Sequence, residues 1–418
     1  MNKTAKIILF GFLSLILGAF SGAIVWVVLR VMSIGIDLVW ELIPEYTGMN
    51  DSILYNICVC LIGGLLIGLW QRKYGILPDD MEQVMGKVKA TGGYPYNNLP
   101  VIAVAALLPL IFGGALGPEA GLSGLIAGLC CFVGDRLKDK GDEVAALTET
   151  GIAATLGVIF NAPLFGIAGN LEPDNRKEKY RTKLVSKKSR IILYVMGVLG
   201  GMLAMQLLGM IFGKGAGLPR FDAEYSYGIE QWKWFLALVI AGVIFALFYL
   251  TVNKITTMIG EKIKNHRIIS CMLAGLIVAI VGYFLPLSMF SGEHEMGELA
   301  VHWAEFSAAT LILTAVAKLF LINVCINLGW KGGSIFPIIF SGLTVGYSIA
   351  FITGIDGSFA VAVCIAALYA YIMKKPVTVA AVLLLCFPVT YIIPIFISAF
   401  IASKIPVPPA VVVEHGEE

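Results

Sequence analysis

Two short stretches, Gly113-Gly-Ala-Leu-Gly-Pro-Glu119 and Gly332-Gly-Ser-Ile-Phe-Pro337, interrupt long apolar segments of this chain. We call residues 113–119 the first break and residues 332–337 the second break. Glycine lets the backbone turn and approach another group closely, and proline suits the first turn of a new helix. Each stretch therefore predicts the end of one helix and the start of another. Ordinary glycine content, which lets membrane helices pack closely, is the alternative interpretation.

The composition is that of a membrane protein. Of 418 residues, 58% are apolar and 14% are charged, and the mean hydropathy is +0.86. Soluble domains average about 45–50% apolar and about 25% charged residues. We expect an all-α polytopic membrane protein with a single transmembrane domain over residues 1–418. The predicted spans are 6–34, 52–71, 99–112, 119–134, 146–171, 190–213, 232–258, 269–287, 306–329, 335–353, 358–373 and 377–403.

The chain contains an internal repeat. Gly-punctuated apolar helices at Leu15–Trp26 and Leu236–Tyr249 open two blocks, 6–172 and 190–403, and each block contains one break. Matched glycine and proline interruptions in two halves point to a transporter with its site near the bilayer midplane. We predict two inverted-topology repeats with tilted, re-entrant and broken helices. Because the tail after Lys404 is short, we expect no C-terminal soluble regulatory domain.

Polar segments separate by charge sign, which predicts the orientation. Segments 2–6, 71–73, 138–140, 176–190 and 254–267 are rich in Lys and Arg, whereas 41–51, 221–230 and 293–305 are acidic. By the positive-inside rule the basic segments are cytoplasmic. Both termini are then expected on the cytoplasmic side of the cell membrane.

The remaining composition excludes several partners and cofactors. A net charge of +2 gives no reason to expect nucleic acid. The eight cysteines lie in apolar segments without metal-ligand spacing, so we expect no metal and no other cofactor. The chain lacks Gly-x-Ser-x-Gly, His-Glu-x-x-His and paired intramembrane Asp residues, so an enzyme is not expected.

The two breaks suit a small anion. Moving a bare ion into a medium of low dielectric costs of order 20 kcal/mol, and one helix N-terminus returns about 0.3–2 kcal/mol. Several backbone N–H groups must therefore converge on it. Neither break contains Lys or Arg, which would hold an anion too tightly to release it. Lys331, just outside the second break, either attracts ions or is a snorkelling interfacial side chain.

These residues resemble a known family. Gly114-Ala-Leu-Gly-Pro-Glu119 resembles the helix start G-x-x-G-P of the CLC chloride channels and chloride/proton exchangers. Gly333-Ser-Ile-Phe-Pro337 resembles their second anion-binding segment. Segments 138–143, 150–166, 242–254 and 355–376 extend the similarity over nearly the whole membrane domain. The resemblance implies two inverted repeats, a homodimer and one pore in each subunit.

The resemblance also implies an anion-binding set. Backbone N–H groups of Ser334 and Ile335 would bind chloride, below the turn that contains Gly114, Ala115, Leu116 and Gly117. The family's third segment is degraded here to Gly75-Ile-Leu-Pro78, followed by Asp79 and Asp80. Gly75 stands where a Ser hydroxyl usually meets the ion, so one donor is lost.

The chain departs from the family pattern where protons are handled. Leu116 replaces the glutamate that plugs the outer anion site, and an apolar side chain cannot carry a proton. Pro173 stands at the internal proton donor, with Glu172 one residue before it. Residues 405–413 contain no Tyr to match the tyrosine of the family's last helix. These losses favour uncoupled transport.

Two carboxylates are candidates for gating or proton transfer. Glu119 lies three residues after Leu116, on the same helix face, and is either a displaced gate or a first-turn residue that meets the helix dipole. Glu172 is either a proton entry point or a solvated interfacial carboxylate. Glu293, Glu295 and His302 lie in a predicted external loop and lack a metal-binding pattern.

Three functions remain open. The first is transmembrane transport of a small inorganic anion, with chloride expected, through a CLC-like pore that is uncoupled or atypically gated. The second is chloride/proton antiport with Glu119 as the displaced gate, and the third is a non-conducting sensor or scaffold. Fluoride, nitrate and bicarbonate remain alternative substrates because backbone N–H groups select charge and size more than identity.

Overall fold

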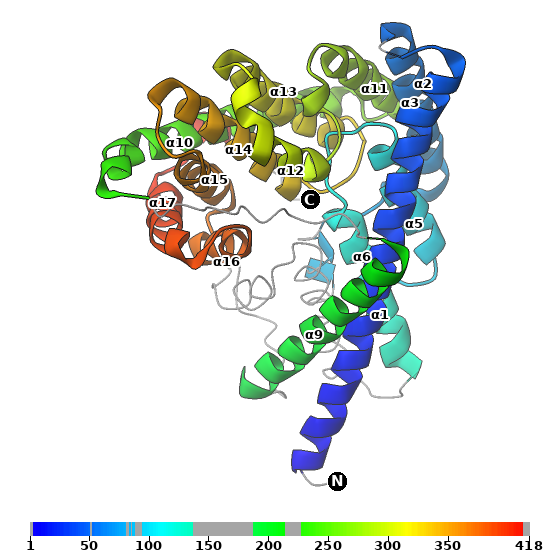
Figure 1. The fold of residues 1–418 in the computed structure, drawn as a ribbon. Helices are drawn as coiled ribbons and strands as arrows, with labels where there is room; N and C mark the ends of the chain where they lie inside the picture. Colours follow the sequence, from blue (N-terminus) through cyan, green and yellow to red (C-terminus); the bar gives the residue numbers. More distant parts are fainter. Residues whose placement is uncertain are drawn as a thin grey trace. The chain divides into compact units, whose positions relative to one another are not determined.

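The structure is a computed structural model, which describes residues 3–50, 52–80, 83–84, 86–87, 94–136, 187–213 and 227–412. The regular secondary structure of these residues consists of helices (Figure 1). Seven of the described helices are long and apolar enough to cross a membrane. The predicted span 146–171 and the candidate Glu172 lie outside the described residues.

The chain divides into two compact units. The first comprises Met1–Gly35, Leu77–Leu107 and Pro118–Gly217. Its helices are most of α1 (Lys3–Asp37) and α5 (Leu99–Ile111), with α6 (Glu119–Arg136) and α9 (Lys187–Phe212).

Helices α1 and α9 of the first unit lie side by side (Figure 1). Glycines form their contact, because a Cβ on Gly18 would lie 1.9 Å from the carbonyl oxygen of Gly197. One on Gly22 would lie 2.4 Å from that of Gly201. Small residues of this kind let two membrane helices approach closely.

The second unit comprises Ile36–Ile76, Leu108–Gly117 and Leu218–Glu418. It begins with a π-helical turn (Leu38–Leu42). Its α-helices are α2 (Ile43–Thr47), α3 (Ile53–Tyr74), α10 (Phe235–Ile263), α11 (Arg267–Phe284), α12 (Glu293–His302), α13 (Ala308–Asn327), α14 (Ile335–Thr353), α15 (Gly357–Met373), α16 (Pro376–Cys386) and α17 (Ile392–Lys404).

Helix α15 is the centre of the second unit. Every residue from Phe359 to Tyr371 is buried, and the helix packs against α10, α14 and α17. A helix that is apolar on all sides belongs inside a bundle rather than at its surface. Helix α14 is buried along most of its length as well, so the start of α14 lies inside the protein.

The predicted helix starts at the breaks are confirmed. Helix α6 begins at Glu119 and helix α14 spans Ile335–Thr353, as the proline positions indicate. The repeat boundaries, 6–172 and 190–403, stay a prediction.

Two sequence predictions are wrong. The single span 377–403 is two helices, because Phe387 is extended and Pro388 cannot continue a helix. Residues 293–302 form helix α12 rather than a loop, and Glu293 is buried, while the external placement of this segment stays a prediction. Acidic residues in the first turn of α12 favour the helix because they meet the positive end of its dipole.

Candidate functional site

Residues 113–117 of the first break meet the second break within the second unit. The Gly117 N–H donates to the Gly333 carbonyl at 2.8 Å, and the Gly333 N–H donates to the Gly117 carbonyl at 2.7 Å. This antiparallel bridge joins residues that are far apart in the chain. Both glycines are buried, so the pairing sets the position of one break against the other away from water.

The first break is a tight turn. Gly113 has a φ of 87°, which suits glycine, and the Gly114 N–H donates to the Pro109 carbonyl at 2.8 Å. The Leu116 N–H donates to Gly114 O at 2.8 Å, and the Ala115 N–H lies close to the Cys325 sulfur. To bind an anion, the backbone N–H groups of this turn would have to give up these acceptors. Their role as anion ligands stays a prediction.

Leu116 is fully buried against the second break. A Cβ on Gly332 would lie 2.8 Å from the Leu116 Cβ, so glycine is needed for this approach. The apolar side chain thus fills the space between the breaks.

The second break ends in the start of α14. Ser334 precedes the first helical residue, Ile335, and its side chain does not cap the helix. The first N–H groups of any helix have no intrahelical acceptor and carry partial positive charge. Ser334 and Ile335, the predicted ligands, therefore lie where an anion is favoured, and Ser334 is only half-buried.

Tyr249 is a residue of this region that sequence reasoning missed. Its phenol lies close to the Ser334 side chain, and Tyr249 itself is buried in α10. The Asn323 amide of α13 donates to the Tyr249 carbonyl at 3.3 Å and keeps the two helices in register. The polar residues Tyr249 and Asn323 within apolar spans were the available signal, because such side chains bond across membrane helices.

Gln71 is a second residue that sequence reasoning missed. It is buried at the end of α3, and its amide donates to the Gly329 carbonyl, just before the second break. The Trp330 indole donates to the Cys271 carbonyl at 2.8 Å. These bonds hold the approach to the second break against α3 and α11.

Gly75 ends α3 with a φ of 87°, and nothing lies within 4 Å of the place where its Cβ would be. Its predicted role as an anion ligand stays a prediction. The link from α3 to the second break is made instead by Gln71, four residues earlier.

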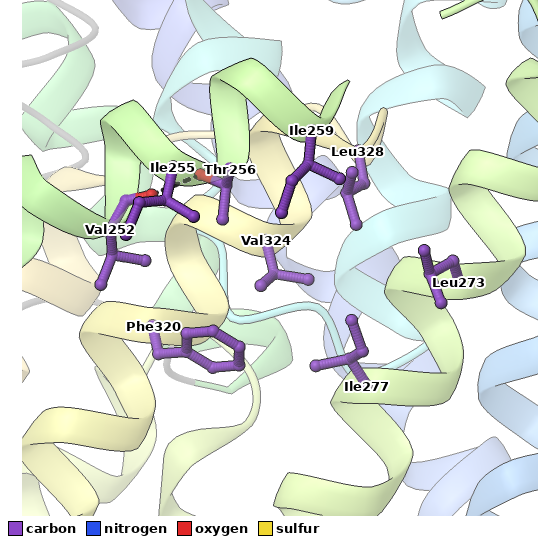
Figure 2. Close-up of a pocket in the computed structure, with 9 residues that line it drawn as sticks. All are labelled: Val252, Ile255, Thr256, Ile259, Leu273, Ile277, Phe320, Val324 and Leu328. Atoms are coloured by element: carbon purple, nitrogen blue, oxygen red, sulfur yellow. Dashed lines mark hydrogen bonds between the residues drawn. The ribbon is translucent and has the colours of Figure 1, made fainter. Parts of the chain in front are cut away.

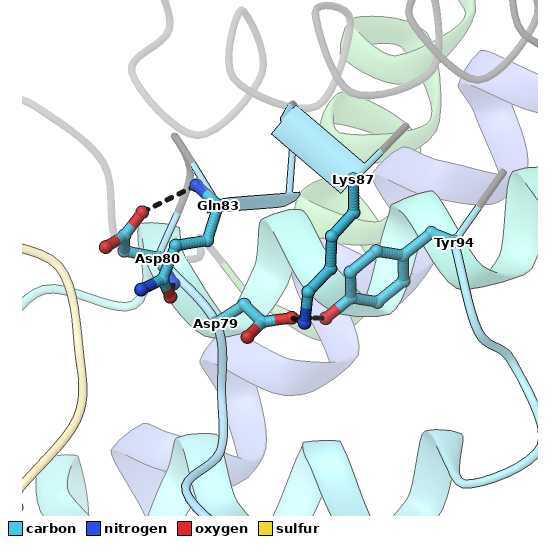
Figure 3. Close-up of polar contacts among 5 residues, drawn as sticks. All are labelled: Asp79, Asp80, Gln83, Lys87 and Tyr94. Carbon is cyan, nitrogen blue, oxygen red and sulfur yellow. Dashed lines mark hydrogen bonds and ion pairs between the residues drawn. The ribbon is translucent and has the colours of Figure 1, made fainter. Parts of the chain in front are cut away.

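Asp79 and Asp80 order a loop of the first unit (Figure 3). Asp79 accepts from the Tyr94 hydroxyl at 2.8 Å and pairs with the Lys87 ammonium at 2.5 Å. The Asp80 carboxylate accepts from the Gln83 N–H at 2.8 Å. Burial and then the bond to Asp79 raise the pKa of Tyr94, so its hydroxyl stays a donor.

Glu119 is the first residue of α6 in the first unit, and only 2% of it is exposed. Its carbonyl accepts from the Ser123 hydroxyl at 2.6 Å. The position suits both predicted interpretations, a gate and a residue that meets the helix dipole.

In the second unit, His302 pairs with Glu305 at 2.8 Å, and the described residues contain no cluster of metal-ligating side chains.

A cavity of about 200 Å³ lies between α10, α11 and α13 (Figure 2). Its lining is apolar except for Thr256, whose hydroxyl donates to the Val252 carbonyl at 2.8 Å. The cavity thus offers an anion no N–H or O–H donor comparable to those at the breaks. The lining residues are Val252, Ile255, Thr256, Ile259, Leu273, Ile277, Phe320, Val324 and Leu328.

Known structures share this fold. A slow cyanobacterial Cl-/H+ antiporter matches with a TM-score of 0.77 and 19% identity over 93% of this chain and 92% of that chain. A CLC-type fluoride/proton antiporter matches with a TM-score of 0.71 and 19% identity, over 98% and 99%. The predicted all-α polytopic fold of CLC type is therefore confirmed.

Related sequences agree with the structures. YfeO of Escherichia fergusonii and of Shigella flexneri, which carries the name of an ion-transport protein, is 27% identical over 337 residues. The match covers 79% of this chain and 76% of YfeO. The profile of the family described as "Voltage gated chloride channel" matches residues 59–406. The chain therefore belongs to the voltage-gated chloride channel family, the CLC family, whose members transport small anions across membranes.

Proposed function

We propose that each subunit conducts chloride through a site at the two breaks, without coupling to protons. The observation that carries the proposal is the reciprocal bridge between Gly117 and Gly333, which places both breaks beside the start of α14. The partial positive charge there, with the hydroxyls of Ser334 and Tyr249, would replace water around the ion. Several such groups together offset a desolvation cost that one helix dipole cannot.

Leu116 favours transport without proton coupling. This side chain is fully buried between the breaks and can neither accept a proton nor compete with an anion. The second candidate is chloride/proton antiport through Glu119, and the observation that favours it is the burial of this carboxyl group. Ionisable residues inside a membrane commonly serve transport.

Flux measurements distinguish these functions. Purified protein in chloride-loaded liposomes is assayed with a chloride electrode and an internal pH dye, as wild type, Glu119→Gln and a matched control, Glu261→Gln. Glu261 is exposed and pairs with Lys264. We expect chloride efflux without uphill proton movement in all three.

Other results would support one of the alternative functions. Uphill proton movement that Glu119→Gln abolishes would establish antiport in place of uncoupled conduction. No efflux of chloride, fluoride, nitrate or bicarbonate would leave a sensor or scaffold. Because backbone donors discriminate weakly between anions, the relative rates of the four ions name the substrate.

The proposal extends to assembly and orientation. We infer a homodimer in the cell membrane with both termini cytoplasmic, from family membership and from the basic turn between α10 and α11. We propose no enzymatic reaction for the chain.

The orientation is tested with a green fluorescent protein fused to the C-terminus. The fusion should fluoresce in cells, because this protein does not fold after export through the general secretory pathway. A dark fusion at normal expression would contradict a cytoplasmic C-terminus.

A further inference from the structure

Lys318 is the one charged residue in the sequence of α13, and it is completely buried. Its ammonium donates to the Leu287 carbonyl at 3.1 Å and to the Met289 carbonyl at 2.6 Å. The same nitrogen lies 4.4 Å from the centre of the Phe340 ring. A charged side chain inside a membrane protein is costly and is usually kept for a function.

The two carbonyls belong to the loop 285–291 between α11 and α12, which lies on the first break. The Phe290 N–H donates to the Gly113 carbonyl at 3.4 Å, and a Cβ on Gly113 would lie 2.5 Å from the Met289 Cε. Phe290 has a φ of 55°, which residues other than glycine adopt rarely. The loop therefore holds a strained conformation directly against the residue that opens the first break.

The third partner of Lys318 belongs to the helix of the second break. Phe340 lies in α14, five residues after Ile335, and it is fully buried. A Cβ on Gly292 would lie 2.8 Å from the Phe340 ring, so the end of the loop also packs against α14. One ammonium group thus contacts both the loop on the first break and the helix that starts at the second.

We propose that Lys318 is a positioning residue of the anion path, which holds the first break in its place relative to the start of α14. The inference rests on the proposed function. An ammonium carries three N–H donors, and here two point at carbonyls while the ring face takes the cation. Because its donors are engaged outside the breaks, Lys318 does not trap the transported ion.

The test compares Lys318→Met, Lys318→Arg and a matched control, Lys374→Met. Lys374 makes the same kinds of contact at the exposed end of α15, with the Ile405 carbonyl at 2.7 Å and the Tyr371 ring at 3.9 Å. Chloride efflux gives the half-saturating concentration, and hydrogen exchange with mass spectrometry follows peptides 285–291 and 111–117.

Lys318→Met is expected to raise the half-saturating chloride concentration about tenfold, as for the loss of a hydrogen bond to a charged group. Exchange should become faster in both peptides. Lys318→Arg should stay within about twofold of wild type because it keeps charge and donors. Lys374→Met should change neither the half-saturating concentration nor the exchange of these peptides. If Lys318→Met does not fold, Lys318→Gln replaces it, and the same directions are expected.

Phe290→Ala separates positioning from a direct effect of charge. It removes the edge contact with Trp40, at 5.5 Å between ring centres, and should reproduce the effect of Lys318→Met. Unchanged exchange in Lys318→Met, with or without altered flux, overturns the proposal. If the wild type shows no flux, only the proposed conduction is contradicted. Hydrogen exchange of the two peptides and chloride affinity from calorimetry then test the role of Lys318.

Discussion

At the residue scale, hydroxyl groups are the feature that distinguishes the start of α14. Backbone N–H groups favour any small anion, whereas a hydroxyl adds a donor of defined direction. Ser334 and Tyr249 supply two such groups from different elements, and their side chains lie close to each other in this structure. A bound anion would accept from both of them.

Removal of the Tyr249 hydroxyl tests this arrangement. Tyr249→Phe should weaken chloride binding by about three- to tenfold, since one hydrogen bond contributes about 0.5–1.5 kcal/mol. Isothermal titration calorimetry in detergent measures the affinity. Tyr283→Phe is the control, because Tyr283 is exposed at the end of α11. Equal affinities for the two variants would remove Tyr249 from the site.

Gln71 also acts at the residue scale, through the chain that approaches the second break. Gln71→Leu leaves the part-buried Gly329 carbonyl without this donor and should lower the free energy of unfolding by about 1–3 kcal/mol. Gln83→Leu removes an exposed side-chain bond to the Asp80 N–H and should cost less. Chemical denaturation followed by tryptophan fluorescence compares them, and an equal loss would show that burial of the Gln71 bond is unimportant.

At the element scale, proline and glycine have local and non-local effects. Pro388 ends a helix through its own backbone, so the division between α16 and α17 could have been read from the sequence. The glycines of α1 have a different role. Gly18 and Gly22 are needed because another helix lies against them, and only the structure identifies that helix as α9.

The α1–α9 contact gives a prediction with a control in the same helix. Gly18→Ala places a methyl group on the Gly197 carbonyl and should destabilise the protein by about 1–3 kcal/mol or more. Gly11→Ala meets only Met196, at 3.9 Å, and should be tolerated. Melting temperatures in detergent measure the difference. A Gly18→Ala protein as stable as Gly11→Ala would mean that α1 and α9 do not touch at Gly18.

At the scale of the whole molecule, a bound anion should stabilise the fold. A ligand that binds only the folded state adds about 2.7 kcal/mol at 100 times its dissociation constant. The melting temperature should therefore rise with chloride at constant ionic strength, with gluconate as the replacing ion. Differential scanning fluorimetry of wild type and Tyr249→Phe measures it, and the rise should need more chloride in the variant. Identical melting temperatures in chloride and gluconate would contradict an anion site.

The sequence by itself determined the membrane class, most of the spans and the starts of α6 and α14. Apolar runs of spanning length act through composition, and proline and glycine act on their own backbone. None of these effects needs a distant residue. The start of α14 at Ile335 was predictable to the residue for this reason.

Only the tertiary structure decided which groups meet at the site. The bridge between Gly117 and Gly333, the contact between Tyr249 and Ser334, and the bonds of Lys318 all join residues far apart in the chain. Within a membrane, a polar side chain needs a partner, but its residue type does not say which helix provides it. The packing of the helices determines the partner, so the contacts of Lys318 and Tyr249 could not be predicted from the local sequence.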